Sequence, residues 1–261
     1  MKPASLLSPD EARQLRGVLF DLDDTVLTEG LLTRQAYGAI WDLHDAGLTL
    51  AAVTGRPSSW GALLARQWPI AGCVTENGAL HVVRDGAGVS VRDRCDEAVR
   101  RARRAHLASL VERVRRVVPE ARLADDNGGR LSDVAWDIGE RERLSPEHVR
   151  AIESEIGAAG ARSTRSSVHL HATFDSDDKA SGALDFCARE LGCAPTSVLA
   201  RFAFVGDSAN DAACFGAFRT TFGVANVRAH LAGLTIPPRY VSAEAMGAGF
   251  AEIAHEILRK R

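Results

Sequence analysis

Three things are scarce in this sequence, and each scarcity narrows what the protein can be. The five cysteines include no C-x-x-C pair, which argues against a zinc site or a disulfide framework and favours a reducing cytoplasm. No apolar run approaches the length of a transmembrane helix, and we expect no signal peptide at the N-terminus. With 34 acidic and 32 basic residues, neither sign of charge dominates, so we expect neither a nucleic acid nor a membrane as partner.

The 261 residues are enough for a large core with a second, smaller domain. Short apolar runs at 17–22, 48–53 and 202–205 are typical of buried strands, and helical patterns follow them. Because strands and helices alternate, we predict an α/β fold with a Rossmann-like parallel sheet core. We assign this core to 1–83 and 175–261. The segment 84–174 lacks acids at its strand ends and is predicted to be an inserted, smaller α/β cap domain that sets substrate specificity.

Polar side chains follow three of the predicted strands at the point where each strand ends. Asp21 and Asp23 follow the first, Thr54 follows the second, and Asp207 follows the third. In open α/β sheets, ligands bind outside the carboxyl ends of the strands. We therefore expect these side chains to converge at one edge of the sheet.

The converging acids suit phosphoryl transfer once a cation is present. A carboxylate that attacks a phosphate ester is repelled by about 4 kcal/mol at about 4 Å and an effective dielectric near 20. Mg²⁺ held between Asp21 and Asp207 would reverse that repulsion, since it prefers oxygen ligands. Asp21 can then act as the nucleophile and form an aspartyl-phosphate. Asp23 can protonate the leaving group and later deprotonate a water molecule.

Other residues are suited to hold the phosphoryl oxygens. Thr54 offers a hydroxyl, Gly55 lets a backbone N–H approach closely, and Lys179 offers a cation. Asn210 can donate an amide hydrogen. Asp211 opens a predicted helix, where it can orient Lys179 or a metal-bound water.

These segments resemble the four motifs of the haloacid dehalogenase (HAD) superfamily of phosphatases. They occur in the family's order and frame nearly the whole chain. The matches are Asp21-Leu22-Asp23-Asp24-Thr25 to D-x-D-x-T, Thr54 to the second motif, Lys179 to the third, and Gly206-Asp207-Ser208-Ala209-Asn210-Asp211 to G-D-x-x-N-D.

The inserted segment and the run Glu76-Asn77-Gly78-Ala79 look like the sugar-phosphatase branch of this family. That branch carries an α/β cap and is similar to sucrose-phosphate, trehalose-phosphate and mannosyl-phosphoglycerate phosphatases and to eukaryotic phosphomannomutases. The resemblance implies Asp21 as nucleophile and Asp23 as acid/base. It also implies Mg²⁺ on Asp21, on the carbonyl of Asp23 and on Asp207.

Some further side chains have two open interpretations. Arg56 contacts the substrate or pairs with a carboxylate. His169 and His171 alternate on the strand expected over 167–174; with no third ligand nearby, we favour a substrate-facing or ordinary polar face over a metal site. The possible substrate contacts are Arg56, Asn77, Arg130, Asp133, His169 and His171, although surface salt bridges explain Arg130 and Asp133 equally well.

The sequence as a whole predicts a cytoplasmic, Mg²⁺-dependent phosphatase of a small phosphorylated metabolite, most simply a sugar phosphate. Two alternatives stay open. A phosphohexomutase would return the phosphoryl group to another hydroxyl, and a non-catalytic protein would only bind the phosphorylated ligand. The sequence leaves the sugar and the oligomeric state open.

Overall fold

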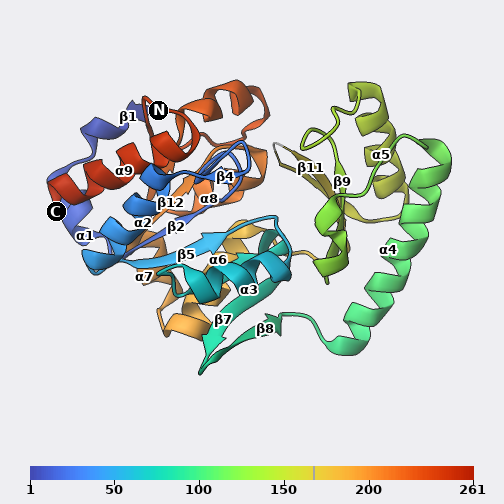
Figure 1. Ribbon diagram of the computed structural model, residues 1–261, viewed down its shortest axis with the longest axis horizontal. Helices are drawn as coiled ribbons and strands as arrows, with labels where there is room; N and C mark the ends of the chain where they lie inside the picture. The colour runs from blue at the N-terminus through green and yellow to red at the C-terminus, as the bar shows by residue number, and fades with distance from the viewer. Residues whose placement is uncertain (167) are drawn as a thin grey trace.

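The computed structural model describes residues 1–166 and 168–261. It contains two domains, with both chain termini on the larger one, at the side away from the smaller one (Figure 1). The larger domain is built on a nine-stranded sheet of order β1-β14-β13-β12-β2-β5-β6-β7-β8. The strands are β1 (Lys2–Pro3), β2 (Gly17–Phe20), β5 (Thr49–Val53), β6 (Gly72–Thr75), β7 (Leu80–Asp85), β8 (Gly88–Asp93), β12 (Phe202–Gly206), β13 (Thr220–Gly223) and β14 (Tyr240–Val241).

The central strand β2 carries buried apolar side chains on both faces of the sheet. All neighbours from β1 to β6 are parallel, and β2 lies between β12 and β5. Successive side chains of a strand point to opposite faces. Accordingly Leu19 and Phe20, both fully buried, belong to different apolar clusters. The predicted Rossmann-like α/β core is therefore confirmed.

Helices form the outer layers of this core. One apolar cluster packs under α1, α2 and α9, and the other under α6, α7 and α8. The helices are α1 (Pro9–Gln14), α2 (Arg34–Asp45), α3 (Ser58–Gln67), α6 (Lys179–Leu191), α7 (Pro195–Arg201), α8 (Ala212–Ala217) and α9 (Met246–Lys260), with 3₁₀ turns η1 (Ala4–Leu6), η2 (Glu76–Gly78), η4 (Ala209–Asp211) and η5 (Ala225–Gly233). None of the helices that the structure describes is both long and apolar enough to cross a membrane.

The smaller domain packs two helices on a three-stranded antiparallel sheet of order β10-β11-β9. A third apolar cluster, around Trp136, joins these layers. The expected strand over 167–174 is observed as β11, while Ser167 lies outside the described residues. The elements are α4 (Glu97–Val117), η3 (Asp125–Gly129), β9 (Asp133–Asp137), α5 (Pro146–Ala158), β10 (Arg162–Arg165) and β11 (His169–Thr173).

The core sheet extends past the boundary expected at residue 84. Strands β7 and β8 form an antiparallel hairpin, and Asp85 pairs with Gly88 at its tip. Gly86 has a φ of 57°, a left-handed conformation that glycine adopts without steric cost. The sequence boundary rested on the lack of strand-ending acids, a criterion that does not detect an edge hairpin. On strand pairing, the core continues to Asp93.

Candidate active site

Asp21 and Lys179 meet at the centre of the sheet edge. Asp21 directly follows β2, and its backbone N–H donates to the carbonyl of Val205 on β12 at 2.9 Å. Lys179 is the first residue of α6, which Asp178 caps by accepting from the N–H of Ser181. The Nζ atom of Lys179 lies 2.8 Å from Oδ1 of Asp21, and both side chains are buried.

Asp211 holds Lys179 in place from the other side. Its Oδ1 lies 2.8 Å from Nζ of Lys179, and its Oδ2 accepts from the backbone N–H groups of Asp207 and Ser208 at 2.9 and 3.1 Å. Because both oxygens are already engaged, Asp211 is arranged to orient Lys179. This arrangement corresponds to one of the two roles expected from the sequence.

Asp207 is fixed by two neighbours that the sequence argument did not assign to the site. Thr25 donates from Oγ1 to Oδ1 of Asp207 at 3.2 Å, and Asn226 donates from Nδ2 to Oδ2 at 3.1 Å. Thr25 is the threonine of the D-x-D-x-T run, so its sequence signal was present. Asn226 lies in η5, outside the four motifs, and only the fold brings it here.

Burial and crowding of like charges perturb the pKa values of this cluster. Burial raises the pKa of Asp21 to about 7, partly offset by Lys179 and reinforced by Asp211 and Asp23. Burial, together with Asp211 and Asp21, raises the pKa of Asp207 well above its ordinary value. For Lys179, burial works against the charge, yet Asp21 and Asp211 outweigh it and raise its pKa.

The cluster has the donor set of a divalent-cation site. Oxygen atoms of Asp21, Asp207 and Asp211 all lie within 4.8 Å of one another and are buried. Three carboxylates face one ammonium group, so two negative charges remain when all are ionised. A hard divalent cation with oxygen ligands fits that charge and that chemistry.

Most of the residues expected to bind phosphate follow β5 and β12, the strands on either side of β2, at the same edge of the sheet. Thr54 follows β5, is buried, and accepts from the backbone N–H of Arg56 at 3.1 Å, which leaves its own hydroxyl hydrogen available to donate. A Cβ atom at Gly55 would lie 3.3 Å from the side chain of Asn77, so glycine keeps this approach open. Asn77 in turn accepts from Nδ2 of Asn210 at 3.4 Å.

Arg56 binds the carboxylate of Asp23 with two nitrogens. Its Nη2 lies 2.8 Å from Oδ1 of Asp23, and its Nε lies 2.9 Å from Oδ2. The guanidinium also stacks over the ring of Trp60, 4.5 Å from the centroid. Burial opposes the charge of Arg56, but the bonds to Asp23 and Glu140 prevail and raise its pKa. Of the two open interpretations, the structure shows the carboxylate pairing.

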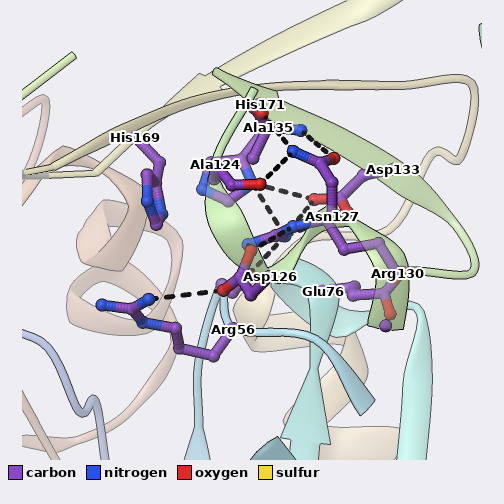
Figure 2. Close-up of polar contacts among 12 residues, drawn as sticks. Arg56, Glu76, Ala124, Asp126, Asn127, Arg130, Asp133, Ala135, His169 and His171 are labelled. Atoms are coloured by element: carbon purple, nitrogen blue, oxygen red, sulfur yellow. Dashed lines mark hydrogen bonds and ion pairs between the residues drawn. The ribbon is translucent and has the colours of Figure 1, made fainter. Parts of the chain in front are cut away.

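The same guanidinium reaches across to the smaller domain. It donates from Nη2 to Oε1 of Glu140 at 2.6 Å and from Nη1 to Oδ2 of Asp126 at 3.3 Å, as Figure 2 shows for Asp126. Glu140 then bonds to Nε2 of His169 at 2.8 Å. The hydrogen bond from His169 and the bonds from Arg56 lower the pKa of Glu140 to about 2.

Arg130 and Asp133 form a buried pair, which corrects the surface salt bridge considered from the sequence. Arg130 donates to Asp133 at 3.1 Å and to Asp126 at 2.9 Å (Figure 2). It also donates to the carbonyl of Gly55 at 2.9 Å. His171 Nδ1 lies 2.8 Å from Oδ2 of Asp133. Burial lowers the pKa of His171 to about 4, which keeps the ring neutral at pH 7.

The two histidines do share a face of β11, with ring centroids 5.8 Å apart. His169 pairs with Glu140 and His171 pairs with Asp133, both acids of the smaller domain. In this structure the two histidines therefore form an ordinary polar face of β11. Sequence reasoning missed Glu140, which lies in a loop, and Asp126, which lies in η3, because neither belongs to one of the four motifs or shows a ligand spacing.

A cavity of about 410 Å³ opens beside Asp23 at the junction of the domains. Its charged lining is acidic except for Arg56. Its described lining residues are Asp23, Asp24, Glu29, Gly30, Arg56, Gly139, Glu140, Val168 and Met246. Part of this lining comes from the hairpin of β3 (Leu27–Thr28) and β4 (Leu31–Leu32), where Glu29 has a φ of 49°.

Known structures share this two-domain arrangement over almost their full length. A protein from Thermoplasma acidophilum superposes with a TM-score of 0.71 at 20% identity, covering 94% of this chain and 98% of its own. The sucrose-phosphatase of Synechocystis, solved with sucrose and phosphate, gives 0.64 at 17% identity over 93% and 98%. A HAD-superfamily phosphatase from Bacteroides thetaiotaomicron gives 0.65 at 18% identity over 97% and 98%.

The chain has the fold of the HAD-superfamily phosphatases. No protein-family model matches the sequence, and no curated protein matches it. The family resemblance drawn from four short motifs is confirmed by these structures at the level of the fold.

Proposed function

We propose that this chain is a Mg²⁺-dependent phosphatase that hydrolyses a small phosphate monoester, a sugar phosphate, through an aspartyl-phosphate on Asp21. The observation that carries the proposal is the buried meeting of Asp21, Lys179 and Asp207 at the carboxyl edge of the sheet. The shared fold with HAD phosphatases, including a sucrose-phosphatase, supports the same chemistry.

The metal would be held by Asp21, the backbone carbonyl of Asp23 and Asp207, with Asp211 orienting Lys179. When bound, Mg²⁺ supplies positive charge that offsets the repulsion between the attacking carboxylate and the phosphate. Thr54, Gly55, Lys179 and Asn210 would bind the phosphoryl oxygens, and Lys179 keeps the positive charge needed for this because its pKa is raised.

Asp21 attacks phosphorus through a carboxylate oxygen, and the bond from phosphorus to the leaving oxygen breaks. Asp23 gives that oxygen its proton. Water then attacks phosphorus while Asp23 takes a proton from it, and the bond between Asp21 and phosphorus breaks to release inorganic phosphate. Because Arg56 binds both oxygens of Asp23, we infer that Asp23 must turn from Arg56 toward the leaving group before it acts as the acid.

The sequence predicts the cap as 84–174 on a core of 1–83 and 175–261, and strand pairing moves its start past Asp93. We propose that this cap closes over the leaving group. The cavity of about 410 Å³ beside Asp23 has room for a monosaccharide-sized group, and its carboxylates can accept hydrogen bonds from hydroxyls. We also propose a cytoplasmic location, because all five cysteines are free thiols in the structure.

The test is release of inorganic phosphate from a panel of hexose phosphates and from p-nitrophenyl phosphate, with and without Mg²⁺. We expect release that needs Mg²⁺ and that falls roughly 10³-fold or more in Asp21→Asn. The exposed Asp42→Asn on α2 is the matched control and should retain full activity. Wild-type rates from Asp21→Asn would refute the nucleophile. Hexose 6-phosphate formed from hexose 1-phosphate, without free phosphate, would identify a mutase, and binding without turnover would identify a sensor.

A further inference from the structure

The carboxylate of Glu76, in the turn after β6, is buried at the contact between core and cap. Its Oε2 accepts from the N–H and the hydroxyl of Ser132 at 2.5 and 2.8 Å and from the N–H of Leu131 at 3.0 Å. Its Oε1 accepts from the N–H groups of Leu131 and Ser58 at 3.0 and 3.3 Å. Most of these donors belong to the cap, although Glu76 belongs to the core.

The same short cap segment, Gly129–Ser132, makes two other bonds to the core. Ser58 donates from Oγ to the carbonyl of Gly129 at 3.2 Å, and Arg130 donates to the carbonyl of Gly55 at 2.9 Å. A Cβ atom at Gly129 would collide with the side chain of Ser59 at the start of α3. The segment is thus docked closely against the core, with Glu76 receiving its backbone donors.

The backbone at Glu76 favours a role in this contact over a role in the turn itself. Glu76 and Asn77 have φ values of 51° and 54°, in the left-handed region. Asparagine enters this region readily, whereas a residue such as glutamate pays about 1 kcal/mol or more. A turn alone would not select glutamate here, but a contact that needs a long side chain with two acceptor oxygens would. Burial also raises the pKa of Glu76 to about 7, as expected for a carboxylate removed from water.

Docking of this segment brings the cap acids to the site. Arg130, within the segment, holds Asp126, and Asp126 meets the guanidinium of Arg56 (Figure 2). We propose that Glu76 is a positioning residue: it docks the segment Gly129–Ser132 and thereby holds the cap closed over the leaving-group cavity. The effect on turnover rests on the proposed phosphatase function, while the docking itself does not.

Three variants separate docking from general stability. Glu76→Ala removes all the acceptors, and Glu76→Gln keeps one oxygen and the shape. Thr75→Val is the matched control next door, because the Thr75 hydroxyl is buried without a hydrogen-bond partner in the part of the chain that the structure describes. Hydrogen–deuterium exchange is measured on peptides that cover 129–135 and, for comparison, on peptides of α5 and β2.

We expect Glu76→Ala to raise the exchange rate at Leu131 and Ser132 at least 10-fold and to leave exchange in α5 and β2 unchanged. Glu76→Gln should restore most of the protection, and Thr75→Val should match the wild type. In Glu76→Ala, kcat/KM for the hexose phosphate should fall at least 10-fold. The kcat/KM for acetyl phosphate should fall less, because this substrate is too small to need the cap. Unchanged exchange at 131–132, or a rise spread evenly over both domains, would overturn the docking role. An inactive wild type would refute the phosphatase proposal instead, and the exchange result would still decide the docking.

Discussion

The charge of the leaving group should decide how well a phosphate ester binds. Among the described residues that line the cavity beside Asp23, four carboxylates, those of Asp23, Asp24, Glu29 and Glu140, face one guanidinium, that of Arg56. Three negative charges are left over when all are ionised. Arg56 is itself committed to Asp23, Glu140 and Asp126, so it has no free face for an anionic substrate group.

The size of the effect follows from distance and screening. At about 7 Å, a separation typical of a cavity this size, two unit charges repel by about 2.4 kcal/mol at an effective dielectric of about 20. Water in the open cavity and a Debye length of about 8 Å at physiological salt reduce the summed repulsion. We expect a net penalty of about 1.4–2.8 kcal/mol for an added carboxylate, which is ~10–100-fold in affinity.

Competition against p-nitrophenyl phosphate hydrolysis measures this penalty even for poor substrates. Glucose 1-phosphate and glucuronic acid 1-phosphate share a ring and differ only in one hydroxymethyl or carboxylate group. The inhibition constant should be higher for the glucuronic acid ester, and the difference should shrink in Glu29→Gln and at high salt. The exposed Glu147→Gln on α5 serves as the control variant and should leave it unchanged. Equal constants, or tighter binding of the anionic ester, would refute the electrostatic reasoning.

Two further predictions concern stability. Lys179→Met leaves Asp21 and Asp211 buried without the ammonium group that pairs with them. The free energy of unfolding in urea should therefore fall by about 3–5 kcal/mol without metal and by less with Mg²⁺. An equal loss in both conditions would argue against a cation site at the cluster. His171 has a pKa of about 4 in the folded protein against about 6.5 when unfolded, so its contribution to stability is present above pH 6.5 and is lost as the pH falls toward 4. The wild type should therefore lose up to about 3 kcal/mol over this window from this group, a loss that His171→Gln should lack; identical urea midpoints for the two proteins across this pH range would contradict the assignment.

The part of the site on the core could be predicted because short-range pattern and topology agree there. Each of Asp21, Thr54 and Asp207 follows an apolar run, and parallel strands bring their carboxyl ends to one edge. Nothing more than strand order is needed to place these residues together. Lys179 was assigned to the site from the helical pattern that it precedes and from its resemblance to the third motif, and the structure shows it as the first residue of α6, capped by Asp178.

The cap side of the site could not be predicted, because its partners are distant in sequence and come together only by docking. Arg56 meets Asp126 across 70 positions and Glu140 across 84. The sequence offers Arg130 and Asp133 as possible substrate contacts or surface salt bridges, whereas the fold buries both as a pair. It shows Glu76 only as part of the run that resembles the sugar-phosphatase branch. The predicted domain boundary at residue 84 falls within the β7–β8 hairpin for a related reason, since only strand pairing shows to which domain the hairpin belongs.

One guanidinium touches both halves of the molecule. If the smaller domain swings away, Arg56 parts from Asp126 and Glu140 and is left with Asp23 alone, so the whole of its charge falls on one carboxylate. If the domain returns, that charge is divided among three. Asp23, the proposed proton donor, would thus experience a different electric field in the open and closed forms. Protonation of the leaving group would then be held back until the substrate is enclosed.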